Sequence, residues 1–133
     1  AMIRSINPAG LAPPVGFAHG CLSEGGRVLW LAGQNGTDAE GPIVHPGDLV
    51  SQTDLALANL LEVVREAGGR PDQVVKLHLY VRDVAAYRGA RRDLGQVWKR
   101  RFGRHYPAMM LLGVSCFFDE EALVEVDGYA VLS

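Results

Sequence analysis

The stretch ALANLLEVVREAGGRPDQVVKLHLYVRD, residues 56–83, decides the fold. Its first part carries apolar residues at helical spacing, and Gly68-Gly69 supplies a stop signal for that helix. After the turn signal Pro71-Asp72, apolar and polar residues alternate from Val75 to Arg82, which is typical of a half-buried strand. The stretch therefore predicts a helix that leads, through a short turn, into a strand with one face in the core.

The sequence before this stretch predicts three strands and the start of the helix. Asp48 is a suitable N-cap, so the helix is expected to begin there. The segment RVLWLAG, Arg27–Gly33, has apolar residues at both odd and even positions. It therefore predicts a strand that is apolar on both faces. Two shorter strands are expected over residues 2–6 and 17–23.

The sequence after the stretch predicts a second helix and two further strands. An apolar stripe runs from Tyr87 to Phe102 and is closed by Gly103. The segment AMMLLGVSCFF, Ala108–Phe118, has almost no polar group, whereas a strand with one wet face should alternate. Alternation returns over Ala122–Leu132. We therefore expect both faces of the Ala108–Phe118 strand to be covered, one of them by a partner subunit.

The resulting order, β-β-β-α-β-α-β-β, predicts the fold class. Single helices between strands favour an α+β domain with a mixed sheet and both helices on one face. With 133 residues the chain has the usual length of a single domain, so residues 1–133 are interpreted as one unit. The opposite face of the sheet then has to be buried by oligomerisation.

Composition excludes several classes of protein and of site. No apolar run approaches the roughly 20 residues that span a bilayer, and the N-terminus lacks signal-peptide features, so we expect a cytoplasmic protein without a membrane partner. Cys21 and Cys116 form no redox or zinc motif and are expected to be buried thiols. The four histidines lack metal-ligand spacing, so neither a metal nor another cofactor is expected.

Charge is unevenly distributed along the chain. The formal net charge is −2, yet the segment Arg82–His105 contains eight Lys or Arg and only two Asp. Such a basic segment could attract anions, although a solvated helix face is the simpler interpretation. Because the net charge is negative and no aromatic stacking platform is evident, we do not expect a nucleic-acid partner.

Four blocks carry a resemblance that covers nearly the whole chain. In this order they are NPAGLAPPVGFAHG (7–20), GGRVLWLAGQNGTD (25–38), residues 56–83 and LVEVDGYAV (123–131). Together they are similar to the RidA/YjgF family, also labelled endoribonuclease L-PSP. The resemblance implies a chorismate-mutase-like fold, a homotrimer with clefts between subunits, and hydrolysis of imines or enamines of 2-amino acids to 2-keto acids and ammonia. It also implies an arginine that binds the substrate carboxylate and a glutamate that positions or activates water.

The chain departs from the family's pattern at most of the implied site positions. After Pro107-Ala108 the anchoring arginine is replaced by Met109, and the cysteine two positions later by Leu111. Ala32, before Gly33, replaces a serine; Phe17 replaces a tyrosine; and Arg91 replaces an asparagine on the second helix. Only the glutamate remains, as Glu125. A thioether cannot bind a carboxylate as a guanidinium does, so a changed substrate is expected.

These positions leave the functional interpretation open. Glu125 is the candidate catalytic base, and partial burial would raise its pKa. Phe17, Ala32, Gly33, Arg91, Met109 and Leu111 are the candidate residues for binding a small-molecule ligand. The chain is then a divergent imine or enamine hydrolase, a ligand-binding or scaffolding trimer without catalysis, or an RNA-acting protein.

Overall fold

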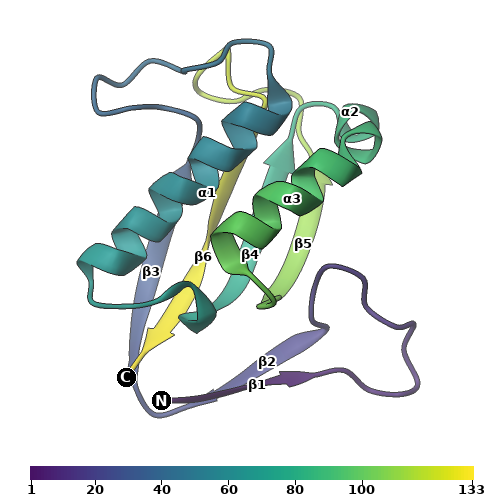
Figure 1. Ribbon diagram of the computed structural model, residues 1–133, viewed down its shortest axis with the longest axis vertical. Coiled ribbons are helices and arrows are strands. Elements are labelled where there is room, and N and C mark those ends of the chain that lie inside the picture. The colour runs from purple at the N-terminus through teal and green to yellow at the C-terminus, as the bar shows by residue number, and fades with distance from the viewer.

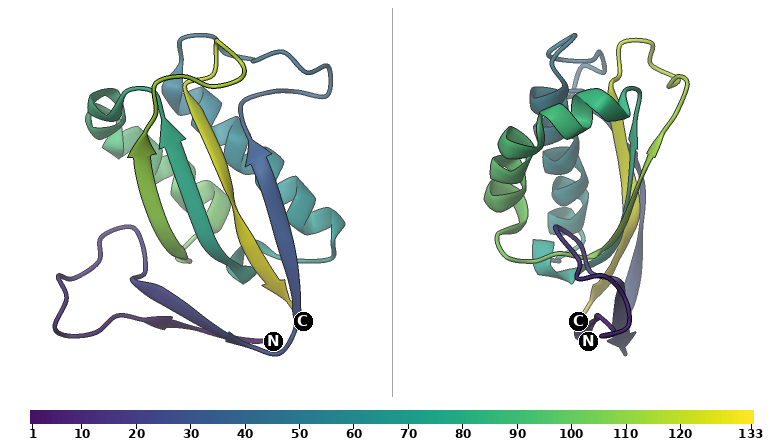
Figure 2. Two further views of the ribbon diagram at one scale, coloured as in Figure 1. Left: turned by 180° about the vertical axis from the view of Figure 1, so that it is seen from behind. Right: turned by 90° about the vertical axis from the view of Figure 1, so that its right-hand side faces the viewer.

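A four-stranded mixed sheet with helices on one face forms the body of the molecule. The computed structural model describes residues 1–133. The sheet has the order β3-β6-β4-β5, with β3 at Arg27–Gln34, β6 at Val124–Leu132, β4 at Val74–Val81 and β5 at Ala108–Gly113. Strand β4 is parallel to β5 and antiparallel to β6, which is itself antiparallel to β3. The expected α+β class with a mixed sheet is confirmed, and Figure 2 shows the two layers edge-on.

The first two strands form a separate ribbon. Strands β1 (Met2–Ile6) and β2 (Gly20–Glu24) pair antiparallel with each other and not with the four-stranded sheet. Figure 1 shows this ribbon beneath the main sheet, with the long 7–19 loop at its far end. A single bridge between Ala18 and Ala108 connects the loop to β5. Because the ribbon adds no strand to the four-stranded sheet, β5 and β3 are its two edge strands.

Helix α1 (Leu49–Glu66) covers the sheet because its apolar stripe is continuous. Asp48 caps its N-terminus by accepting from the Ser51 backbone N–H at 3.1 Å, as the sequence predicts. Leu57, Leu60 and Val64 are fully buried against the sheet. They pack in one cluster with Leu77 and Leu79 of β4 and with Val124 and Val126 of β6. This core keeps β6, the strand that carries Glu125, in place.

The expected second helix is divided in two. Helix α2 spans Val84–Gly89 and helix α3 spans Arg91–Phe102. A short 3-10 turn, η1 at Pro71–Gln73, lies earlier in the chain, directly before β4. Ala90 joins α2 and α3 at φ −100° and ψ 10°, outside the helical region. Gly89 is a weak helix former at this position, and Asp83 caps α2 through the Ala86 N–H at 3.0 Å. The apolar stripe survives the break, since Leu94, Val97 and Phe102 are buried.

Two further expectations need correction after β5. The strand expected over Ala108–Phe118 ends at Gly113, opposite Val81, because its parallel partner β4 ends there. Cys116 therefore lies in irregular chain and is exposed, and Cys21 on the ribbon is only partly buried, so neither is the buried thiol expected. None of the helices combines the length and the apolar character that a membrane span requires.

Gln52 forms hydrogen bonds that hold the loops at the end of the sheet that carries Glu125. Its side chain is fully buried and donates to the carbonyls of His45 (3.1 Å) and Glu121 (3.2 Å). It also accepts from the Leu123 N–H at 2.8 Å. One amide thus joins α1, the loop before it and the segment that leads into β6.

Replacing Gln52 with alanine is expected to lower the free energy of unfolding by about 3 kcal/mol, because buried backbone partners lose their hydrogen bonds. Urea denaturation measures the change. Gln96→Ala, on the exposed side of α3, is the matched control and should change stability by less than about 0.5 kcal/mol. Equal stability of the two variants would show that the loops do not depend on this amide.

Candidate functional site

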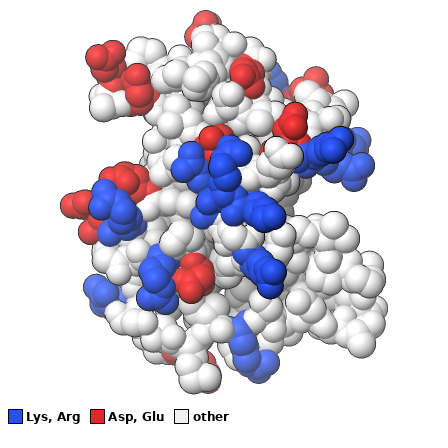
Figure 3. Space-filling model, in the orientation of Figure 1, with Lys and Arg blue, Asp and Glu red and all other residues white.

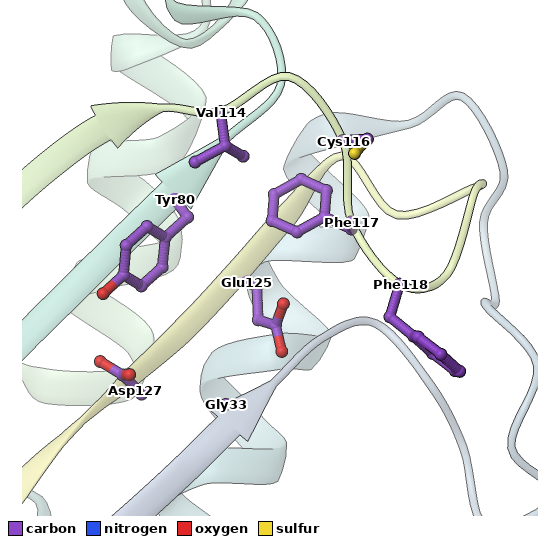
Figure 4. A pocket seen from close by; sticks show the side chains of 8 residues that line it. All are labelled: Gly33, Tyr80, Val114, Cys116, Phe117, Phe118, Glu125 and Asp127. Carbon is purple, nitrogen blue, oxygen red and sulfur yellow. The ribbon is translucent and has the colours of Figure 1, made fainter.

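A hollow on the open face of the sheet contains Glu125. Strands β3, β4 and β6 and the loop after β5 contribute its walls, and its cavity volume is about 430 Å³. Figure 4 shows Glu125 between Tyr80 and Gly33, with Phe117 above the carboxylate and Phe118 to its right. The lining residues are Gly33, Tyr80, Val114, Cys116, Phe117, Phe118, Glu125 and Asp127. Half-apolar walls around a carboxylate are typical of small-molecule sites.

Strand alternation and one glycine direct the Glu125 side chain into this hollow. Its neighbours Val124 and Val126 point into the core, so Glu125 points to the opposite face. Its register partner on β4 is Tyr80, which lines the same hollow. The pairing of β3 with β6 is irregular between Leu31 and Gln34, and this irregularity brings Gly33 against the carboxylate. A Cβ at Gly33 would lie 2.5 Å from Glu125 Oε1, so a larger residue there would displace the carboxylate from its present position.

Glu125 is the unengaged carboxylate of this face. It forms no hydrogen bond or ion pair within the chain, whereas its acidic neighbours are engaged. Asp127 Oδ1 lies 2.7 Å from His78 Nδ1, and Asp119 accepts from Asn35 Nδ2 at 3.1 Å. Partial burial, followed by the negative charges of Asp127 and Asp119, raises the pKa of Glu125 above its ordinary value. A partly desolvated carboxylate with free lone pairs can accept a proton from a bound water.

A second hollow lies on the helix side of the molecule. Its cavity volume is about 370 Å³, and it lies between α3, the end of α2 and the start of β5. Arg91 and Met109 both line it, together with Tyr87 and Trp98. Because α3 covers one face of the sheet and Glu125 projects from the other, Arg91 and Glu125 of one chain do not share a cavity.

The predicted site residues are thus distributed over several places. Gly33 and Glu125 line one hollow, and Arg91 and Met109 line the other. Ala32 lines a shallow hollow beside Trp30, and Phe17 lines another with Arg104 and His105. Leu111 faces the helices and packs against the core, lining neither main hollow.

Sequence reasoning missed several residues that line the Glu125 hollow. Tyr80 was expected on the polar face of its strand, but its position beside Glu125 follows from the β4–β6 register. Asp127 is a polar residue in the alternating segment Ala122–Leu132, and that alternation alone does not mark it as part of a site. The Phe117-Phe118 pair belongs to the loop after β5, where Phe118 is fully exposed. No group of three or more His, Cys, Asp or Glu side chains gathers as metal ligands.

The basic segment forms a cluster over the helices. In Figure 3, Lys and Arg side chains gather on the face that α3 presents, with acidic atoms among them. Arg101 Nε donates to Asp54 Oδ1 at 2.8 Å, and Arg100 lies 3.3 Å from the other oxygen. Part of this charge therefore links α3 to α1.

Comparisons with known proteins show which family the chain and its fold resemble. Residues 11–132 match the model of a family described as endoribonuclease L-PSP. A RutC family protein of Pyrococcus abyssi is 28% identical over 105 residues, which cover 79% of each chain. The 3-aminoacrylate deaminase RutC of Acinetobacter baylyi is 26% identical over 125 residues, or 94% of each chain. The crystal structure of YyfB from Yersinia pestis, a Rid family protein of unknown function, matches with a TM-score of 0.88 and 35% identity over 98% of each chain.

Proposed function

Because the chain belongs to the endoribonuclease L-PSP family, of the RidA/YjgF type, we propose that it hydrolyses an imine or enamine derived from an amino acid. The observation that carries this proposal is Glu125, a free carboxylate with a raised pKa in a half-apolar hollow. An imine is already electrophilic at its C=N carbon, and an enamine becomes so once its β-carbon takes up a proton from solvent. The protein therefore has to supply mainly an oriented substrate and an activated water.

The proposed reaction needs one general base, which takes a proton from water and later gives it back. Glu125 accepts a proton from water while the water oxygen bonds to the carbon of the C=N group, and it then passes this proton to the nitrogen. Glu125 next takes the hydroxyl proton of the resulting carbinolamine and delivers it to the nitrogen, which leaves as ammonia and gives a carbonyl compound. One imine and one water thus give one carbonyl and one ammonia. Glu125 returns its proton, so no cofactor is consumed.

The named activity of a relative supports this reaction class. The Acinetobacter baylyi relative is a 3-aminoacrylate deaminase, and 3-aminoacrylate is an enamine. The substrate of this chain is proposed to differ, because Met109 and Leu111 are apolar where the family resemblance implies an arginine and a cysteine. The test is direct. An imine generated in place by an amino-acid oxidase should disappear, and ammonia appear, faster with the protein than without it.

Binding without turnover is the competing proposal, since the hollows would also hold a ligand in a trimer that does not catalyse a reaction. It requires a ligand that protects the protein against heat while ammonia release stays at the uncatalysed rate for every imine tried. The free carboxylate favours the hydrolase, because a purely apolar binding site gains nothing from a desolvated charge.

A homotrimer is proposed as the active form. The open face of the sheet exposes Trp30, Tyr129, Met110 and Leu112, and the Trp30 side chain is 73% exposed. Figure 2 shows that no helix covers this face. Exposed apolar surface of this kind is common at protein–protein interfaces and supports the proposed trimer. Assembly would also place a second chain against the Glu125 hollow of each subunit.

Light scattering at micromolar concentration is expected to give about three times the chain mass of 14.4 kDa. The measurement should be repeated across a tenfold dilution, because a stable trimer keeps its mass. A monodisperse monomer at all concentrations would contradict both the trimer and an active site shared between subunits.

A further inference from the structure

The hollow on the helix side combines apolar walls with one cation. Tyr87, Leu94, Trp98 and Met109 form the walls. Arg91 is the only charged residue that lines it, and no carboxylate does. Its volume of about 370 Å³ falls within the range of roughly 300–1,000 Å³ found for small-molecule sites. Such a lining favours a ligand that is apolar over most of its surface and carries one negative charge.

Arg91 is available to such a ligand. Its side chain is exposed and makes no hydrogen bond or ion pair within the chain. By contrast, Arg100 and Arg101, two to three turns further along α3, are both held by Asp54. A guanidinium at the rim of an apolar cavity can bind a carboxylate through two parallel hydrogen bonds.

An aromatic ladder ends at this hollow. Trp98 stacks on Phe102, with ring centroids 4.3 Å apart and planes inclined by 16°. Tyr106 lies on Trp98 with its plane inclined by only 5° and its centroid 6.0 Å away. The Trp98 Nε1–H donates to the His105 carbonyl at 3.0 Å and thereby fixes the indole plane. Tyr106 is exposed and lines the hollow together with Trp98, so aromatic side chains form part of its wall.

The neighbouring hollow has the same charge preference. It shares Val15, Gly16 and Tyr106 with the first and adds Phe17 and Arg104. It too is lined by no carboxylate. The two hollows together offer aromatic surface and two arginines, the opposite of the acidic Glu125 hollow. The helix side therefore favours an aromatic anion over a cation or a small polar molecule.

We infer that the substrate is a 2-imino or enamine acid with an aromatic side chain. Its ring occupies the hollow walled by Tyr87, Trp98 and Met109, its carboxylate binds Arg91, and the Glu125 that activates water comes from a neighbouring subunit of the proposed trimer. This inference rests on the proposed hydrolase function for the reaction, but not for the binding. The apolar residue at position 109 thus adds contact area for the ring, and Arg91 supplies the anchor.

Calorimetric titration of the assembled protein with three unreactive probes tests the inference. The probes are 3-phenylpropanoate, the neutral amide 3-phenylpropanamide and the ring-free propanoate. The aromatic acid is expected to bind at least about tenfold more tightly than either, because only it offers both ring and charge. Arg91→Gln should remove the preference for acid over amide, whereas Arg92→Gln, an exposed neighbour that does not line the hollow, should leave it unchanged.

Equal binding of acid and amide, or equal effects of the two arginine variants, would overturn the inference. Turnover is measured separately, with imines of phenylalanine and of alanine. Tight, Arg91-dependent binding without turnover of either imine would refute the hydrolase and keep the aromatic-anion site. Turnover of the alanine imine without binding of 3-phenylpropanoate would keep the hydrolase and refute the aromatic substrate.

Discussion

Replacing Glu125 with glutamine is expected to lower the rate of imine hydrolysis by about 10²–10⁴-fold, the usual contribution of a general base. Glutamine keeps the size and shape of the side chain beside Gly33 but cannot accept a proton from water. The loss should appear in kcat, since the proposed ring and carboxylate contacts come from other residues and Glu125 acts in the chemical step. Steady-state assays of the variant and the unaltered protein measure it.

The pH dependence should identify the same group. Burial raises the pKa of Glu125 above the ordinary value of 4.5, so the active carboxylate form is reached only at a higher pH. Activity is therefore expected to rise with pH, with a midpoint above 4.5. Glu125→Gln should abolish this rise. An acid limb that persists unchanged in the residual activity would assign the base to another residue.

Stability provides the control for this variant. Because the folded-state pKa is raised, the folded chain holds more protons than the unfolded chain in the window between the two pKa values. The contribution of Glu125 to the free energy of unfolding is therefore present at low pH and is lost as pH rises through that window. Glutamine carries no such penalty, so Glu125→Gln should melt no lower than the unaltered protein at pH 7. An inactive variant that melts well below it would indicate a folding defect.

Local sequence pattern predicted the faces of the elements well. The alternation after residue 75 correctly placed Leu77, Leu79 and Val81 in the core, where each is at most 1% exposed. It was wrong at the start of the strand, where Val74 is buried and Val75 only partly so. The pairing of β4 with β6 is irregular between Val74 and Lys76, and such an irregularity depends on the partner strand.

Element ends were harder to predict because distant segments determine them. An apolar run alone could not show that β5 stops at Gly113, since the end of β4 at Val81 determines it. The separate β1–β2 ribbon likewise follows from pairing that leaves no local signal. Glu125 was identified from the family resemblance, whereas Tyr80 and Asp127 join it through register, which only the assembled sheet reveals.

Restoring an arginine at position 109 is expected to raise kcat/KM for a short substrate, 2-iminobutyrate. The family resemblance places the carboxylate anchor there, and an ion pair of this kind contributes about 2–5 kcal/mol when it is desolvated. That energy corresponds to roughly 30- to 5,000-fold in rate. The unaltered chain, with Met109, should therefore turn over 2-iminobutyrate slower by a factor in this range.

The variant for this test is Met109→Arg combined with Arg91→Asn, because both residues line the same hollow and two guanidinium groups there would repel each other. Arg91→Asn alone is the control and should bring no gain. The double variant should at the same time lose affinity for 3-phenylpropanoate, since the apolar wall that Met109 provides is replaced by a charge. If the unaltered protein hydrolyses 2-iminobutyrate as fast as the double variant, a group other than position 109 already anchors short carboxylates, and the apolar residue there does not determine substrate choice.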